Sequence, residues 1–314
     1  MTLGPAYAAT APISSGSPQS RTRQSSIGHP AGSASAYHWS TFWRDFGEGE
    51  QRPERCHIPG DRQETVDRHW SSFASGLARG AEVLDIGCGA GIVGRTLLDC
   101  RSDLFVTGID FAEVPIVTVP NLAIQQGIRM EAMPFEASSF DAAVSLFGIE
   151  YGNVVQTTRE LGRVLKPGGR FSFVMHHCES EIAREGSARV MGIRDALSGK
   201  LKDAFLAGDA ARFDQQRLRL LGQHPAEPTV KLLCDYFART IARAPDERHA
   251  IWCKLEDDVA VEVALTAYMV RCAKAPDQMG SWLVSLLSVM AVTQVSVMRR
   301  KSGEPIAWAV CGVR

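Results

Sequence analysis

The sequence has 314 residues, with 34 lysines and arginines, 35 aspartates and glutamates, and 45% hydrophobic residues. This composition excludes a wholly disordered or collagen-like chain, and its near-neutral charge argues against a general nucleic-acid binder, which needs a clustered basic face. The eight cysteines form no Cys-x-x-Cys pair, so we expect free thiols in a reducing compartment. No apolar stretch reaches the roughly 20 residues of a membrane span. We therefore expect a soluble, cytoplasmic protein.

The N-terminal region divides at about residue 36. Residues 1–36 include 8 Ser, 7 Ala, 4 Gly and 4 Pro without helical or strand periodicity, which predicts a disordered tail; Arg21 and Arg23 among serines leave an organelle transit peptide as the alternative. Residues 37–80 are expected to form an arm of lid helices. The arm begins with an aromatic cluster, namely Tyr37, His38, Trp39, Phe42, Trp43 and Phe46. Those rings either pack the arm onto the domain or cover a ligand pocket.

Residues 81–178 alternate between strand-like and helix-like patterns. Strands are predicted at 81–86, 104–110, 121–126, 140–148 and 170–177, and helices at 91–100 and 153–165. Residues 111–120 carry Pro115 and Pro120, which do not allow a long regular helix. This alternation predicts an α/β core with a parallel sheet and helices on both faces.

Residues 179–292 lose the strand pattern and show apolar residues at helical spacing, separated by Gly and Pro. The remaining residues, 293–314, contain two strand-like runs around a turn with Gly and Pro, which predicts a terminal antiparallel hairpin. We therefore expect a large helical insertion followed by a β-hairpin that completes the core sheet.

The segment VLDIGCGAG at 83–91 carries the chemistry. A buried strand ends in Asp85, and three glycines then allow a tight turn and close backbone approach before a helix begins, namely Gly87, Gly89 and Gly91. This arrangement predicts a nucleotide-like ligand over the turn. The acidic group at the strand end favours the ammonium of S-adenosylmethionine over the pyrophosphate of NAD.

A dinucleotide cofactor is the alternative for the same turn. Gly89, Gly91 and Gly94 satisfy G-x-G-x-x-G, and Asp110 follows at the end of the second strand. Asp110 is placed to accept both hydroxyls of a ribose, a role that suits either cofactor.

Four segments in this order resemble the class I S-adenosylmethionine-dependent methyltransferases, in particular the ubiquinone/menaquinone-type small-molecule group: 83–91, 106–110, 130–148 and 159–173. The most characteristic is RELGRVLKPGGRFSF at 159–173, whose Lys-Pro-Gly-Gly turn leads into the fifth strand. The resemblance implies a doubly wound, Rossmann-like, seven-stranded sheet of order 3-2-1-4-5-7-6 with the last strand antiparallel. It also implies S-adenosyl-L-methionine as cofactor, S-adenosyl-L-homocysteine as product, and substrate recognition by the helical insertion.

The resemblance also implies roles for single residues. Asp85 and the turn, with Cys88, would face the methionyl end of the cofactor, Asp110 the ribose, and Phe111 one face of the adenine. Met130, Glu131 and Ala132 would contact the edge of the adenine, and Phe147 would lie beside the sulfonium. Relatives commonly have an acidic residue just after the third strand, and here either Glu131 or a backbone carbonyl would take its place.

Candidates for a general base follow strands four and five, where open α/β sheets bind their ligands. They are Glu150, Tyr151, His176 and His177. Each could instead be a pocket wall or a local hydrogen-bonding group. Neighbouring side chains on a strand point to opposite faces, so we do not expect the adjacent histidines to bind a metal.

We therefore expect methyl transfer to an oxygen or carbon of a small organic metabolite by in-line displacement, by a monomer or homodimer. Nitrogen is less favoured because no Asn/Asp-Pro-Pro-Tyr segment follows strand four. The alternatives are a non-methylating S-adenosylmethionine enzyme and a noncatalytic cofactor-binding protein of the same fold. A basic set in the helical block is expected to face solvent, and its convergence on a cavity would indicate an anionic acceptor: Arg194, Lys200, Lys202 and Arg217.

Overall fold

The computed structural model describes residues 36–47, 61–115 and 118–314. The segment predicted as a tail, except Ala36, lies outside these residues, as do residues 48–60 within the predicted arm. The described chain forms two compact units. Residues Met191–Leu255 form the helical unit, and the described residues within Ala34–Val190 and Glu256–Arg314 form the sheet unit.

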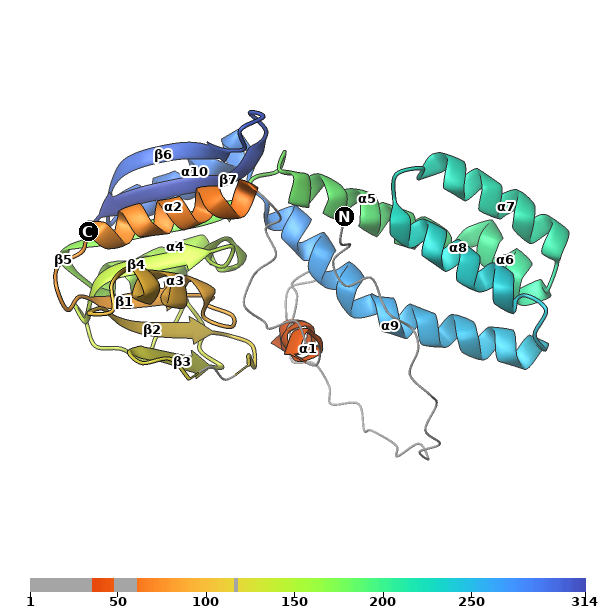
Figure 1. The fold of residues 1–314 in the computed structure, drawn as a ribbon, viewed down its shortest axis with the longest axis horizontal. Helices are drawn as coiled ribbons and strands as arrows, with labels where there is room; N and C mark the ends of the chain where they lie inside the picture. The colour runs from red at the N-terminus through yellow and green to blue at the C-terminus, as the bar shows by residue number, and fades with distance from the viewer. Residues whose placement is uncertain (1–35, 48–60, 116–117) are drawn as a thin grey trace. The chain divides into compact units, whose positions relative to one another are not determined.

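A seven-stranded sheet organises the sheet unit (Figure 1). Its order is β3-β2-β1-β4-β5-β7-β6. The strands are β1 Glu82–Ile86, β2 Phe105–Asp110, β3 Leu122–Gln126, β4 Phe140–Leu146, β5 Leu165–His176, β6 Ala291–Arg299 and β7 Pro305–Val313. Strands β1 to β5 pair in parallel, whereas β7 is antiparallel to both β5 and β6. The predicted order and the antiparallel last strand are confirmed.

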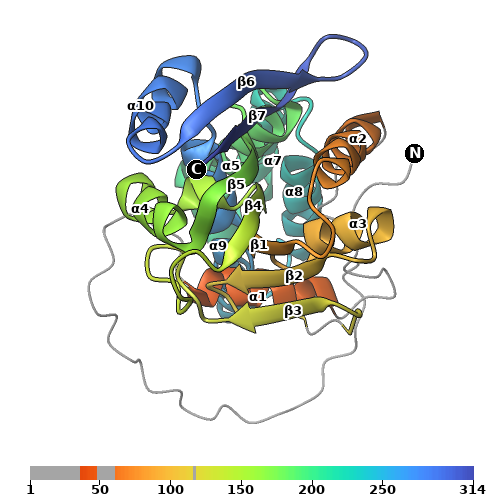
Figure 2. The same cartoon turned by 90° about the vertical axis from the view of Figure 1, so that its left-hand side faces the viewer.

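Helices cover both faces of this sheet (Figure 2). On one face, α2 (Asp61–Ser75) and α3 (Ile92–Cys100) contribute Trp70 and Leu97 to a buried apolar cluster with strand residues. On the other face, α4 (Val154–Val164) and α10 (Pro276–Leu287) contribute Leu161 and Trp282 to a second cluster. Burial of these rings and aliphatic side chains is the main stabilisation of the sheet unit, and the doubly wound prediction is confirmed.

Strand β5 differs from the sequence prediction at its start. It begins at Leu165 rather than Arg170, and its register against β4 shifts between Phe140 and Ala142. The Lys-Pro-Gly-Gly segment lies within this irregularity, and Gly168 adopts a φ of 77°, which glycine tolerates without strain. In the described parts of 111–120, the expected absence of a long helix is confirmed.

The insertion between β5 and β6 is helical, as predicted, and it contains six helices. They are α5 Glu181–Ala196, α6 Gly199–Ala207, α7 Ala210–Gln223, α8 Pro228–Thr240, α9 Pro245–Cys272 and α10. Helices α5 and α9 each contribute residues to both units. No helix in the described part of the chain combines the length and apolar character that crossing a membrane requires.

The helical unit has its own aromatic core. Phe205, Phe213, Phe237 and Trp252 are each no more than 1% exposed, and the rings of Phe237 and Trp252 stack with centroids 4.8 Å apart. The buried Arg248 guanidinium donates to the Leu206 carbonyl at 3.0 and 3.2 Å. It thereby satisfies a carbonyl at the end of α6 that has no helical partner.

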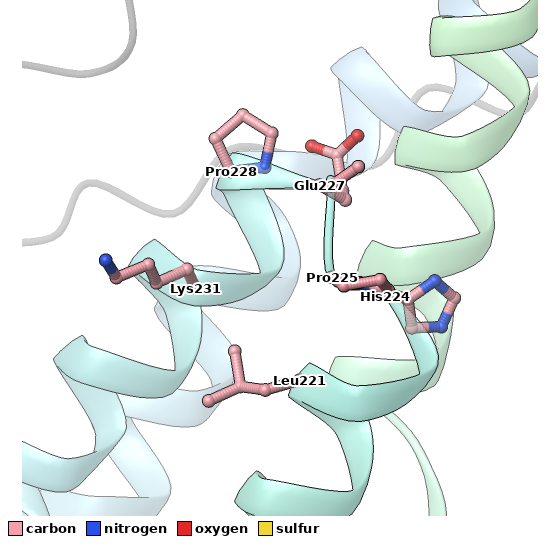
Figure 3. A pocket seen from close by; sticks show the side chains of 7 residues that line it. Leu221, His224, Pro225, Glu227, Pro228 and Lys231 are labelled. Atoms are coloured by element: carbon pink, nitrogen blue, oxygen red, sulfur yellow. The ribbon is translucent and has the colours of Figure 1, made fainter.

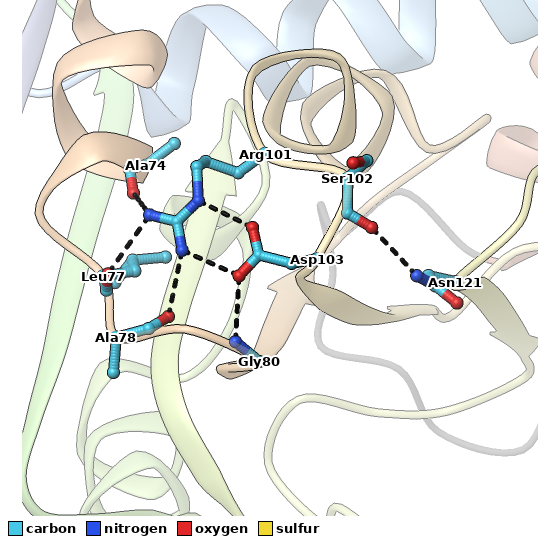
Figure 4. Close-up of polar contacts among 8 residues, drawn as sticks. All are labelled: Ala74, Leu77, Ala78, Gly80, Arg101, Ser102, Asp103 and Asn121. Atoms are coloured by element: carbon cyan, nitrogen blue, oxygen red, sulfur yellow. Dashed lines mark hydrogen bonds and ion pairs between the residues drawn. The ribbon is translucent and has the colours of Figure 1, made fainter.

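A hydrogen-bonded cluster joins the end of α2 to the start of the sheet (Figure 4). The Arg101 guanidinium binds both carboxylate oxygens of Asp103 at 2.7 and 2.8 Å and also donates to backbone carbonyls that follow α2. Asp103 accepts from Gly80 N at 3.0 Å, and the Arg101 bond holds the pKa of Asp103 below its usual range. The cluster fixes the segment that leads into β1.

Candidate active site

Asp85 lies at the carboxyl end of β1 with an exposed fraction of 1%. Its Oδ2 accepts a hydrogen bond from Gly94 N at 3.2 Å, whereas its Oδ1 has no partner among the described residues. Burial raises the pKa of Asp85 to about 7, the Gly94 bond opposes this shift, and the nearby Asp110 adds to it. A buried carboxylate with a free oxygen is costly, and a cation would supply the missing partner.

The three glycines of the turn have different neighbours. A Cβ on Gly87 would lie 2.9 Å from the Gly148 Cα, and one on Gly91 would lie 2.9 Å from Ile124 Cδ1. These two glycines therefore allow close packing inside the fold. At Gly89 the neighbour is different, because an added Cβ would lie 2.2 Å from the ring of Trp43 on α1 (Ala36–Gly47). Of the three glycines, Gly89 is thus the one that lies against α1.

Cys88 and Asp110 tie this turn to β2. The Cys88 thiol lies against Gly108 and donates to the Gly89 carbonyl, and burial raises its pKa well above the usual value. The Asp110 carboxylate accepts from Gly89 N through Oδ2 and from Ala112 N through Oδ1, both at 2.8 Å. Burial raises the pKa of Asp110 as well. Each carboxylate oxygen retains a second lone pair, so this group can still accept from a ribose hydroxyl.

The residues predicted at the adenine lie after β2 and β3. The Arg129 guanidinium lies over the Phe111 ring at 5.1 Å. Glu131 accepts from Asn153 N at 2.9 Å through Oε1, and its Oε2 pairs with Arg129 at 3.5 Å. The Glu131 carboxylate therefore fixes the start of α4 in this structure.

Two neighbours of Glu131 complete the predicted adenine edge. The thioether of Met130 lies against Gly152, where an added Cβ would come within 2.4 Å of the sulfur. The exposed Ala132 donates its N–H to the Arg129 carbonyl.

Glu150 and His176 form a buried pair beyond β4 and β5. Glu150 belongs to the short helix η1 (Ile149–Tyr151). Its Oε1 accepts from the His176 backbone N at 2.8 Å and from its Nδ1 at 2.7 Å. Because an ionised carboxylate only accepts, Nδ1 carries the hydrogen in this pair, and in the neutral imidazole the lone pair then lies on Nε2. The exposed fractions are 4% for Glu150 and 6% for His176.

The surroundings of this pair hold the imidazole in place. The Phe147 ring stacks on it at 4.1 Å, and Phe147 itself has a φ of 53°. The buried Ser145 hydroxyl donates to the Ile86 carbonyl and accepts from Ile149 N, which joins the ends of β1 and β4. Sequence reasoning missed Ser145, because a serine inside an apolar strand has no distinctive pattern.

His177 and Tyr151 have other environments. The His177 ring stacks on Trp308 at 4.8 Å, its Nδ1 accepts from Glu179 N, and burial lowers its pKa. The Tyr151 ring lies 6.0 Å from that of His176, between Trp39 at 5.1 Å and Tyr268 of α9 at 5.4 Å. The structure thus brings Glu150, His176 and Tyr151 together and separates His177 from them.

Tyr268 is a site residue that the sequence did not single out. Its hydroxyl donates to the Tyr151 carbonyl at 2.9 Å. Burial, with Cys272 as a nearby second cause, raises the pKa of Tyr268 to about 12. The sequence did not reveal this role, because Tyr268 lies in a long helical pattern in which it reads as an ordinary core residue.

The helical unit contains a surface depression between α7 and α8 (Figure 3). Leu221, His224, Glu227 and Lys231 contribute to its lining, together with Pro225, Ala226 and Pro228. The basic set considered for an anionic acceptor does not contribute to it. Within the described residues, no group of three His, Cys, Asp or Glu side chains is arranged to hold a metal ion.

Comparison with known proteins assigns this part of the chain. Residues 84–173 match the family model described as a methyltransferase domain. Over these residues the chain is similar to methyltransferase domains, and its strand order is the one that the resemblance to class I S-adenosylmethionine-dependent methyltransferases implies. Both the match and the strand order support this assignment.

Curated relatives are similar over the same region. A sterol 4-C-methyltransferase of Caenorhabditis elegans is 35% identical over 105 residues, covering 30% of this chain and 31% of the relative. A demethylmenaquinone methyltransferase of Tropheryma whipplei is 34% identical over 113 residues, covering 33% and 46%. This chain therefore spans less than half the length of these two relatives. A solved S-adenosylmethionine-dependent methyltransferase from Aquifex aeolicus aligns with 12% identity and a TM-score of 0.44 over 87% of this chain and 97% of that one.

The region that matches the methyltransferase model has groups that fit S-adenosylmethionine. The orphaned Oδ1 of Asp85 would meet the amino group of S-adenosylmethionine, and Gly89 adds no side chain of its own beside it. Asp110 would accept from the ribose, and Phe111 offers an aromatic face for the adenine. These donors and acceptors lie along the carboxyl ends of β1 and β2, where ligands of open α/β sheets bind.

Proposed function

We propose that the protein transfers a methyl group from S-adenosylmethionine to an oxygen or carbon atom of a small organic metabolite. The observation that supports this most is the buried Glu150–His176 pair, near a glycine turn that follows a buried carboxylate with one unpartnered oxygen. The two parts are in direct contact, because Gly87 of the turn lies against Gly148, which precedes η1. A donor on the turn would therefore have a base close to its reactive end.

When bound, S-adenosylmethionine supplies an electrophilic methyl group on a cationic sulfur. The task of the protein is then to align the acceptor and exclude water. Asp85 holds the amino group, Asp110 the sugar, and the buried surroundings strengthen both interactions. Phe147 fixes one face of the His176 ring and keeps water from it.

His176 acts as the general base in this proposal. Glu150 accepts the Nδ1 hydrogen, which fixes the tautomer and leaves Nε2 free to take a proton from the acceptor. The carboxylate also stabilises the imidazolium that forms, as the acidic member of a catalytic triad does. An acceptor such as a phenol, an alcohol or a carbon acid loses its proton in this way as the methyl group arrives.

Two features favour oxygen or carbon as the acceptor atom. The segment after β4 is Phe-Gly-Ile-Glu, which lacks the Asn/Asp-Pro-Pro-Tyr sequence typical of many amino-group methylases. The relatives named above act on a sterol and on demethylmenaquinone, which are apolar ring compounds. Tyr151 and Tyr268 offer aromatic faces that suit such an acceptor.

The experiment measures acceptor-dependent formation of S-adenosylhomocysteine with a panel of phenols, quinols, sterols and isoprenoid alkenes. His176→Asn should lower the rate by about 10² to 10⁴, and Glu150→Gln should lower it by a smaller factor. Both variants should bind S-adenosylhomocysteine as tightly as the wild type, because neither residue holds the donor.

His249→Asn is the matched control, since His249 is exposed on α9, and it should retain full activity. A wild-type protein that methylates nothing in the panel would contradict the proposal. Loss of activity in His177→Asn but not in His176→Asn would move the base to the neighbouring residue.

A further inference from the structure

Helix α1 places two indole rings on one of its faces. Trp39 and Trp43 are four residues apart, so their side chains lie on the same side of the helix. The Trp43 ring lies so close to the Gly89 Cα that an added Cβ would be 2.2 Å from Cζ2 and 2.5 Å from Cη2. The backbone of Gly89 is buried in this arrangement.

Two further contacts hold α1 at the carboxyl ends of the strands. The Ser40 hydroxyl accepts from Glu113 N at 2.9 Å, just after β2. The Trp39 ring lies 5.1 Å from that of Tyr151, which follows β4. One helix thus contacts the segments after β1, β2 and β4 at the same time.

A ligand that uses Gly89 for close backbone approach needs the space that Trp43 fills. Two groups cannot share van der Waals contact with the same face of one glycine. We propose that α1 is an autoinhibitory segment, whose Trp43 ring takes the place of the donor above Gly89, and that α1 must withdraw from the turn before the donor binds. This inference rests on the proposed function, because it takes the glycine turn as the donor site.

The same movement also affects the acceptor side. Because Trp39 and Trp43 share one face of a single helix, lifting Trp43 from Gly89 also lifts Trp39 from Tyr151. Tyr151 lies beside His176, so donor binding uncovers the region where the acceptor must enter. The donor therefore binds first and the acceptor second.

The test is calorimetric titration of the full chain with S-adenosylhomocysteine. Trp43→Ala removes the ring that competes with the ligand for Gly89. We expect the dissociation constant of this variant for S-adenosylhomocysteine to fall at least about fivefold, because binding no longer requires α1 to leave the turn first. Trp39→Ala loosens the same helix without touching Gly89, and its affinity should also rise. Tyr37→Ala is the matched control, since Tyr37 is on α1 but 66% exposed, and its affinity should equal that of the wild type.

Each outcome has a defined meaning. The inference would be overturned if the wild type binds the ligand and both Trp43→Ala and Trp39→Ala bind it more weakly or equally well. Weaker binding would mean that Trp43 packs on the bound donor, and equal binding would mean that Trp43 has no effect on donor binding. Failure of the wild type and of all variants to bind at millimolar ligand would remove the proposed function, and the autoinhibitory segment with it. Thermal melting shows whether each variant has folded. If Trp43→Ala does not fold, the affinity of Trp39→Ala decides whether the inference holds.

Discussion

Asp85 is a single side chain in which stability and binding oppose each other. Its carboxylate is buried, one of its oxygens has no partner among the described residues, and its pKa is raised to about 7. The folded protein therefore binds a proton at this site more tightly than the unfolded chain does. By linkage, the contribution of Asp85 to the free energy of unfolding falls as the pH rises from about 4 to about 7.

If Asp85 holds the ammonium of the donor as proposed, donor binding should depend on pH. The ammonium of the donor attracts the ionised carboxylate, so wild-type affinity for S-adenosylhomocysteine should be constant above about pH 7 and fall up to about tenfold per unit below it. Asp85→Asn should bind at least about tenfold more weakly than the wild type above about pH 7, without this pH dependence, so that the two affinities converge toward pH 5.5, and it should melt at a higher temperature near pH 8. Calorimetry and thermal melting between pH 5.5 and 8.5 would measure both effects.

Asp99→Asn is the control for this prediction, because Asp99 is exposed on the neighbouring helix α3. Its affinity and its pH dependence should match those of the wild type. Retention of tight, pH-dependent binding in Asp85→Asn would show that another group holds the ammonium.

At the scale of elements, the contact between Gly87 and Gly148 joins the ends of β1 and β4. Gly87 has a φ of 63°, and an added Cβ would lie 2.9 Å from the Gly148 Cα, where only backbone is present and cannot move aside as a side chain can. This close approach sets the start of η1, and thereby the position of Glu150.

Replacement of Gly87 by alanine should therefore lower the free energy of unfolding by more than the strain of a positive φ alone would. Gly168 offers the comparison, because its φ is 77° but an added Cβ would meet nothing within 4 Å. We expect Gly168→Ala to lower the free energy of unfolding by about 1 kcal/mol and Gly87→Ala by about 2 to 4 kcal/mol, since it also overpacks a tight site. Denaturant titration would measure both, and equal losses would show that the backbone contact has no energetic weight.

The sequence predicted these elements more reliably than the contacts between them. The glycines of 83–91 were readable as a turn, but their separate neighbours depend on β3, β4 and α1, which are distant in sequence. Similarly, the patterns placed Glu150 and His176 after different strands, and only the pairing of β4 with β5 brings them within 2.7 Å. Glu131 shows the same limit, because its contact with Asn153 N depends on where α4 begins.

At the scale of the whole molecule, the chain contains two compact units with separate cores. The order of motifs predicted the strand order, because the resemblance carries the topology of the family. The division within α5 and α9 was not predicted, since helical periodicity continues across it.

The separate cores lead to a prediction about stability and binding. Phe237 is fully buried against Phe205 and Trp252 in the helical unit. Phe237→Ala should lower the stability of that unit by about 3 to 5 kcal/mol, while affinity for S-adenosylhomocysteine stays within about twofold because the donor groups belong to the sheet unit. Denaturant titration followed by calorimetry of the folded variant would test this. Loss of donor binding in a folded variant would show that the two units are coupled.

The position of β7 has a consequence for synthesis on the ribosome. This strand follows all the others in sequence, yet it lies between β5 and β6. As the nascent chain emerges, the edge of β5 that later pairs with β7 stays unpaired until the six intervening helices and β6 have been synthesised. Such an edge invites pairing with other chains, so we expect newly made molecules to depend on chaperones until Pro305–Val313 has left the exit tunnel.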